Sequence, residues 1–270
     1  MKRWIGYSAY ALVVTIVFLV WFFPSDLLKA YVESAVTRHS NTTLSLDSAS
    51  LGFPVVLHFD NAVLSLTGKP GSTVVMESID IEPLFRTLIR GRVALAFTGE
   101  AYGGRGSGTV AFEDSFAVKG PVNAEARFEN IDVGKCSYVK ATLGRKMTGK
   151  VKGTLSWSGF PGRIIDGTGS ADCVFFNGEV RLVENILGFD TVTYDRIDAK
   201  AILKNRTLRI NPFHLIGTEV NSTVSGNIFL DNNPMRSRLS LKGQITVPAL
   251  NKKAGISLSG TASNPVLRVR

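Results

Sequence analysis

The sequence predicts an all-β protein in which a single amino-terminal transmembrane helix precedes a long, strongly bent antiparallel sheet with one or two short helices. Three observations support this: an apolar run opens the chain, apolar and polar residues alternate with a period of two from about residue 40, and glycines interrupt the alternating segments. With 270 residues, of which 44% are hydrophobic and 20% charged, the chain is expected to be packed and ordered.

The first segment predicts a membrane anchor. Residues 5–23 are almost entirely apolar, and as a helix they would span roughly 28 Å, close to the thickness of a hydrocarbon core. The bulky ending at 20–24 is a poor signal-peptidase site, so we interpret the run as uncleaved. The residues assigned to the anchor are Trp4, Ile5, Ile16, Trp21 and Phe23.

Lys2 and Arg3 precede this run and place the amino terminus in the cytoplasm by the positive-inside rule. The predicted localisation is therefore a bacterial inner membrane, crossed once, with the bulk of the chain in the periplasm. The predicted domains are 1–24 (cytoplasmic end and anchor), 25–38 (amphipathic helix) and 39–270 (periplasmic β domain, with a possible seam near 158–162).

The helix at 25–38 follows from a cap at Ser25 or Asp26 and from apolar residues at three- and four-residue spacings. Its polar face is not enriched in Lys or Arg, which favours a helix that caps the domain core over one that lies on a bilayer. Two later segments, 83–91 and 183–188, have the pattern of short helices.

From residue 41 the chain predicts short strands separated by turn residues. Glycines inside these strands, as at 103–108, allow a sheet to bend or bulge, so its inner face is expected to form a continuous apolar trough. The candidate lining residues are Phe97, Phe112 and Phe229.

No catalytic, cofactor or metal site is predicted, and we do not expect an enzyme. The chain lacks a G-x-S-x-G elbow and a phosphate loop, and it has only two cysteines and three histidines. In an oxidising periplasm Cys136 and Cys173 form either a disulfide or two separate buried thiols, and both alternatives stay open.

The net charge of +9 is unevenly distributed. Residues 135–163 and 232–270 carry basic residues without an acid, whereas 40–82 are acidic. A periplasmic location and the lack of RNA-binding aromatics exclude nucleic acid as the partner. One interpretation is that these charges lie on ordinary solvated faces of strands. The alternative is that the basic residues form a rim that contacts lipid phosphates or an acidic partner subunit. The strand-like residues 266–270 form a plausible edge for pairing with another sheet.

Several sequence segments resemble those of the AsmA-like envelope proteins: Ile79–Pro83, the short helix to Gly91, Glu100–Gly108, and 189–199 with its continuation to 228. The short length, the single anchor and residues 259–267 are most similar to the type II secretion system protein N family. The resemblance implies an inner-membrane protein whose periplasmic sheet is bent into a groove or taco shape.

Two functions follow from the resemblance. One is an inner-membrane-anchored, periplasmic accessory component of type II protein secretion, with other secretion subunits as partners. The alternative is an AsmA-like lipid-binding or lipid-transfer protein that shields the acyl chains of phospholipid in its β groove. A wide, continuous apolar trough favours lipid handling, and a narrow interior filled by side chains favours the secretion subunit. A sheet of about fourteen strands would extend only ~65 Å, which is too little to bridge two membranes alone and favours the accessory role.

Overall fold

The computed structural model describes residues 4, 7, 10, 14, 15, 24–39, 42–53, 55–66, 72–89, 91–113, 120–143, 146–186, 189–248 and 252–269. The prediction of an all-β chain is confirmed, because one antiparallel sheet of 15 strands contains most of these residues. Its first half consists of β1 (Thr42–Ser45), β2 (Ser48–Gly52), β3 (Val56–Leu66), β4 (Thr73–Pro83), β5 (Ala94–Ala101), β6 (Gly104–Phe112), β7 (Val122–Asp132) and β8 (Lys150–Gly159). The second half consists of β9 (Thr168–Ile186), β10 (Phe189–Lys204), β11 (Thr207–Ile216), β12 (Asn221–Phe229), β13 (Arg238–Val247), β14 (Lys252–Thr261) and β15 (Pro265–Val269).

The strands follow one another in sequence order from β3 to β15, and β1 and β2 both pair with β3. Two hairpins turn through consecutive residues with positive φ, Tyr102–Gly103 between β5 and β6 and Asn205–Arg206 between β10 and β11. Paired positive φ values match the right-handed twist of the flanking strands. The glycine-rich segment 103–108 therefore lies in a hairpin and its outgoing strand.

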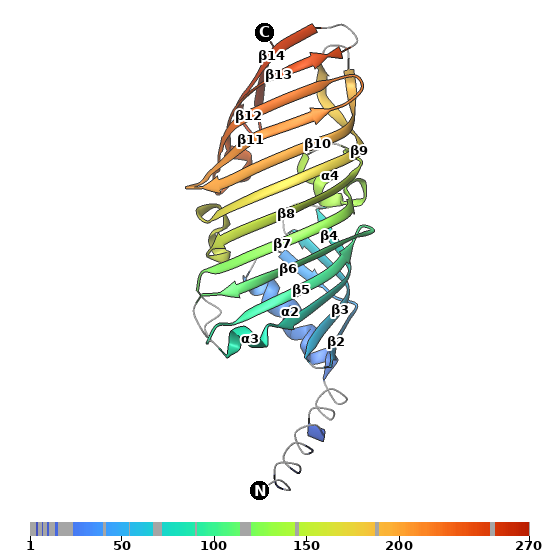
Figure 1. Cartoon of the computed structure of the whole chain (residues 1–270), viewed down its shortest axis with the longest axis vertical. Helices are drawn as coiled ribbons and strands as arrows, with labels where there is room; N and C mark the ends of the chain where they lie inside the picture. Colours follow the sequence, from blue (N-terminus) through green and yellow to red (C-terminus); the bar gives the residue numbers. More distant parts are fainter. Residues whose placement is uncertain are drawn as a thin grey trace.

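The sheet forms a single curved layer, with β2–β4 bending round at one end (Figure 1). Helix α2 (Ser25–His39) lies against this end and packs Leu28 and Val32 on a core of Leu46, Ala49, Phe59 and Ala62. The remaining helices are short: α3 (Phe85–Leu88), α4 (Ser137–Leu143) and the 3-10 turns η1 (Val133–Lys135), η2 (Pro161–Asp166) and η3 (Pro234–Arg236).

The prediction of a membrane-spanning helix, and with it the single-pass inner-membrane localisation, is contradicted. Among the described residues, none of the helices has the length and apolarity needed to cross a membrane. The longest, α2, has 15 residues and carries Asp26, Lys29, Glu33 and Arg38. Of the residues assigned to the anchor, Trp4 is described and exposed, whereas Ile5, Ile16, Trp21 and Phe23 lie outside the described residues.

Three other expectations concern local structure. The helix found at Ser25–His39 covers the range expected at 25–38, and the break at 83–91 contains α3. The helical turn predicted at 183–188 is wrong, because β9 is 19 residues long and continues through 183–186. The range 158–162 covers the end of β8 and the start of η2, and the two strands that this connection joins, β8 and β9, pair from Ser158 back to Lys150.

Candidate functional site

The two faces of the sheet differ in chemistry. Residues paired across neighbouring strands point to the same face, so the register traces one row of side chains over the whole sheet. The row contains no polar side chain: Leu51, Leu57, Ile81, Phe97, Gly108, Ala126, Leu155, Ala171, Ala201, Ile210, Gly226, Leu241, Leu258 and Leu267. We call this the apolar row, and the side of the sheet that carries it the apolar face.

Aromatic side chains on this face lie over glycines of the next strand. A Cβ added to Gly108 would lie 2.5 Å from the ring of Phe97, and one added to Gly153 would lie 3.0 Å from the ring of Phe128. Trp157 is arranged in the same way beside Gly169. Because the glycines have no side chain, the aromatic rings lie flat on the neighbouring strand, and the face stays apolar and without protruding side chains at these positions.

The apolar face is largely open. Helix α2 covers it at β1 and β2, where Leu28 and Val32 pack against the buried cluster of Leu46, Ala49, Phe59 and Ala62. Over the central strands most apolar side chains are only half-buried, and Leu155 in the middle of the row is 45% exposed. A contiguous, exposed apolar surface of this kind marks a site that contacts something apolar.

The three candidate lining residues do not share one face. Phe97 lies in the apolar row. Phe112 lies on the same face, because it is four residues after Gly108 of the apolar row on the same strand and every second side chain points to the same side. Phe229 follows Ile228 and therefore points to the opposite side, where it is 42% exposed. Its ring contacts the guanidinium of Arg238, 5.7 Å from the ring centroid.

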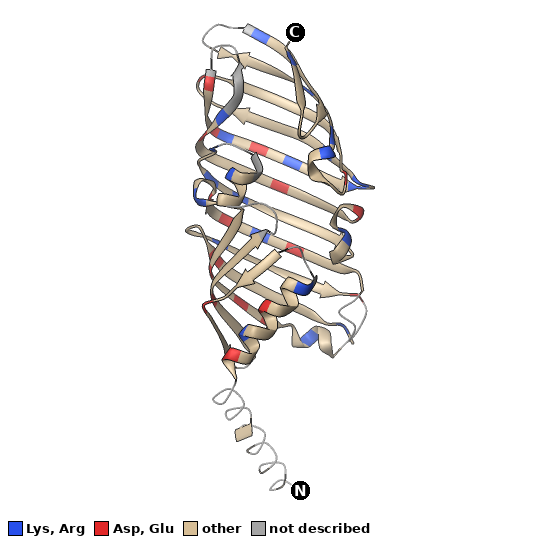
Figure 2. Cartoon of the chain, turned by 180° about the vertical axis from the view of Figure 1, so that it is seen from behind, with Lys and Arg blue, Asp and Glu red and all other residues tan. Residues whose placement is uncertain are grey.

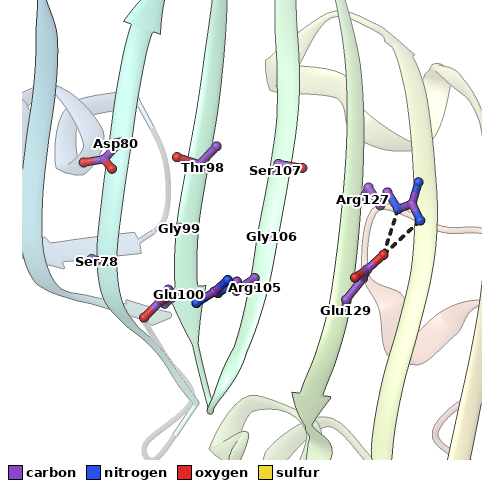
Figure 3. A pocket seen from close by; sticks show the side chains of 10 residues that line it. All are labelled: Ser78, Asp80, Thr98, Gly99, Glu100, Arg105, Gly106, Ser107, Arg127 and Glu129. Carbon is purple, nitrogen blue, oxygen red and sulfur yellow. Dashed lines mark hydrogen bonds and ion pairs between the residues drawn. The ribbon is translucent and has the colours of Figure 1, made fainter.

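The opposite side, which we call the polar face, is lined by charged and hydroxyl side chains. A row one residue away from the apolar row contains Ser50, His58, Asp80, Thr98, Ser107, Arg127, Thr154 and Asp172. Over β4–β7 this face has a shallow depression of about 460 Å³ in which Arg127 pairs with Glu129 at 2.9 Å and Arg105 with Glu100 at 3.0 Å (Figure 3). The two exposed ion pairs are each neutral overall, and Asp80, which also lines the depression, contacts His58.

His58 lies on the polar face between two carboxylates. Its Nδ1 contacts Asp80, and its Nε2 is 3.1 Å from Oδ1 of Asp60. The hydrogen bond that the protonated imidazole donates to Asp80, opposed by some desolvation and aided by both negative charges, raises the pKa of His58 above its usual 6.5. Ser48 donates a hydrogen bond to Asp60 at 2.5 Å, and Ser50 is paired with His58 across β2 and β3. Within the described ranges no group of three or more His, Cys, Asp or Glu side chains is placed to hold a metal ion.

Cys136 and Cys173 are both free thiols in this structure. Cys173 lies on the apolar face between Gly153 and Ala199, and burial, with a smaller contribution from the Asp172 charge, raises the pKa of its thiol. Cys136 follows η1 at the edge of the sheet. A thiol with a raised pKa is a weak nucleophile.

Tyr194 fixes one end of the apolar face. It is 2% exposed, its hydroxyl donates to the carbonyl oxygen of Thr148 at 2.5 Å, and burial raises the pKa of the phenol to about 12. Only the unfolded chain then ionises near the usual pKa of 10.0. The stability contributed by the neutral phenol is therefore complete below pH 10.0 and is lost as the pH rises toward about 12.

We expect Tyr194→Phe to lower the free energy of unfolding by about 1–3 kcal/mol near neutral pH, because the Thr148 carbonyl loses its buried donor. Above the usual tyrosine pKa this difference between wild type and variant should shrink. Urea unfolding of both proteins across the alkaline range measures it. A difference that stays constant with pH would show that the neutral phenol is not what stabilises the fold.

No protein-family model, curated protein or solved structure matches this chain. The sequence predicted an apolar trough, but not its course, because the apolar row is defined only by which strands pair and in what register.

Proposed function

We propose that this protein binds the acyl chains of lipid along its apolar face. The single observation that carries the proposal is the apolar row: 14 successive register positions, from β2 to β15, without a polar side chain on a face that a second layer leaves open. With strands about 4.8 Å apart, the row extends over ~60 Å. An elongated apolar ligand fits such a surface better than a compact one.

The chemistry of the two faces supports the same ligand class. An acyl chain has no hydrogen-bonding groups, so it loses nothing when it lies on Leu, Ile, Phe, Ala and Gly. The charged and hydroxyl groups of the polar face stay in water on the other side of the single layer. The resemblance to AsmA-like proteins, whose larger members carry phospholipid in grooves, implies the same ligand.

A matched pair of variants tests the proposal in the full chain. Leu155 is on the apolar face and 45% exposed, whereas Ile202 is on the polar face and 53% exposed, so neither substitution removes a buried core residue. We expect Leu155→Glu to weaken binding of a dansyl-labelled fatty acid by about tenfold or more, because the carboxylate must be desolvated against the chain. Ile202→Glu should bind like wild type.

Fluorescence titration gives both dissociation constants, and circular dichroism checks that each variant is folded. Equal affinity of the two variants and the wild type would contradict the proposal. Equal loss in both variants would also contradict it, because it would mean that the probe does not distinguish the faces.

A second candidate, an accessory component of type II protein secretion, is supported by the resemblance to the protein N family and by the charged polar face, which offers a large surface to a protein partner. In this proposal the partners are other secretion subunits. Cross-linking in cells through a photoreactive residue at Thr154, on the polar face, would capture such a subunit. The same residue at Leu155 should then capture lipid instead.

A further inference from the structure

The sheet has an open edge at each end. In the part of the chain that the structure describes, β2 pairs only with β3, and β15 pairs only with β14. Both edge strands have five residues. The side chains of β15 are all exposed, and an edge of this kind presents backbone groups that can pair with another strand.

The number of strands decides how two copies can meet. The path from the first strand to β15 contains 14 strands, each antiparallel to the next, so its two end strands run in opposite directions. β1 and β2 are both antiparallel to β3, so they run in the same direction. A second copy placed beyond β15 in the same orientation, and rotated by the twist of the sheet, therefore presents its β2 antiparallel to β15. Its apolar face is then on the same side as that of the first copy.

The apolar row also reaches both edges. It ends at Leu267, the central residue of β15, and at Leu51 in β2. A junction between β15 of one copy and β2 of the next would place these two side chains on one face. The apolar row would then continue from copy to copy.

Charge favours this pairing over the symmetric alternatives. β13–β15 carry five cations and no acid: Arg238, Lys242, Lys252, Lys253 and Arg268. β2–β4 carry four acids and no Lys or Arg: Asp60, Glu77, Asp80 and Glu82. Figure 2 shows basic residues toward the carboxyl-terminal end of the sheet and acidic residues on the strands near α2. Joining two like ends would bring like charges together, whereas a head-to-tail contact joins opposite charges.

We propose that copies of this chain join head to tail, with β15 of one copy pairing antiparallel with β2 of the next, to form a continuous sheet whose apolar row runs from copy to copy and is covered by α2 beside each junction. The contact is heterologous, so successive copies form an open chain, or a ring where the rotation between copies closes. The inference rests on edge geometry and charge and does not depend on whether lipid binds.

Charge reversal at each end tests the junction in the full chain. Variant C carries Lys253→Glu and Arg268→Glu, and variant N carries Ser48→Lys and Ser50→Lys; all four side chains are exposed. Variant C lowers the net charge of β13–β15 from +5 to +1, and variant N changes that of β2–β4 from −4 to −2, so each variant weakens its own junction. In a mixture, the unaltered β15 of variant N meets the unaltered β2 of variant C. We expect each alone to remain at the monomer mass of 29.2 kDa, and an equimolar mixture to recover the assembly of the wild type.

Sedimentation velocity at low and high salt provides the readout. The wild type should have at least twice the monomer mass at about 50 mM salt and should dissociate at high salt, because the contact is between exposed charges. Lys150→Glu with Lys152→Glu, a reversal of the same size in the middle of the sheet, should assemble like wild type.

Three outcomes would overturn the proposal: a wild type that is monomeric at every salt concentration, a mixture that stays monomeric, or variants that assemble alone as well as together. Assembly only after addition of an acidic peptide would assign the β15 edge to a different partner. Circular dichroism of variants C and N separates loss of the contact from loss of the fold.

Discussion

Replacing Gly108 with alanine is expected to destabilise the protein by about 3 kcal/mol or more, because overpacking at a site that cannot relax is among the costly core changes. The added Cβ would lie 2.1 Å from the carbonyl oxygen of Glu125 and 2.5 Å from the ring of Phe97. The carbonyl belongs to the neighbouring strand β7 and the ring to β5, so relief requires the sheet itself to move. Urea denaturation gives the free energy of unfolding.

Gly106 provides the matched control. It lies two residues earlier on the same strand and face, but the nearest atom to an added Cβ is the Arg127 carbonyl oxygen at 3.8 Å, an ordinary contact. Gly106→Ala should therefore change stability by less than about 1 kcal/mol. If the two alanine variants were equally stable, the close seating of Phe97 over Gly108 would be wrong.

Truncating Ile197 to alanine is expected to cost about 2–5 kcal/mol, the range for a buried large-to-small change that leaves a cavity. Ile197 is 2% exposed and points to the apolar face between Phe175 and Leu215. It lies near Tyr194, where the face is most deeply buried. Thermal or urea unfolding of the variant measures the loss.

Ile202→Ala on the same strand is the control. Its side chain is on the polar face and 53% exposed, so removing it should cost less than about 1 kcal/mol. A similar loss in both variants would contradict the assignment of the two faces, on which the candidate lipid site also depends.

Local patterns in the sequence were sufficient for the fold class. Alternation with a period of two predicted the strands, since side chains of a strand point to opposite faces. The cap and spacing at 25–38 predicted the range of α2 for a similarly local reason. The helical turn at 183–188 was wrong because its apolar residues continue a 19-residue strand, and a short run does not distinguish the two periods.

The course of the apolar face was not predictable, because it depends on long-range register. Ile228 and Phe229 are adjacent and both apolar, so alternation alone does not decide which of them points to the apolar face. Bulge-like positions add a second difficulty. Asn61, Asn130 and Asn177 have positive φ inside strands, and at Asn130 the register with the neighbouring strand shifts.

The glycines were predicted to bend the sheet, but their contact with aromatic rings was missed. A signal for it exists only once strands are aligned: Phe97 is paired with Gly108, and Phe128 with Gly153. The prediction of a transmembrane helix rested on hydropathy at 5–23, and the described helices contradict it.

Native mass spectrometry of the full chain, purified from a membrane-containing lysate without harsh detergent, tests whether the apolar face holds lipid. We expect phospholipid or fatty acid to co-purify with the wild type and with Phe229→Glu on the polar face, and to be lost from Leu155→Glu and Phe97→Glu on the apolar face. A wild type of sharp, lipid-free mass, or lipid retained equally by all three variants, would contradict it.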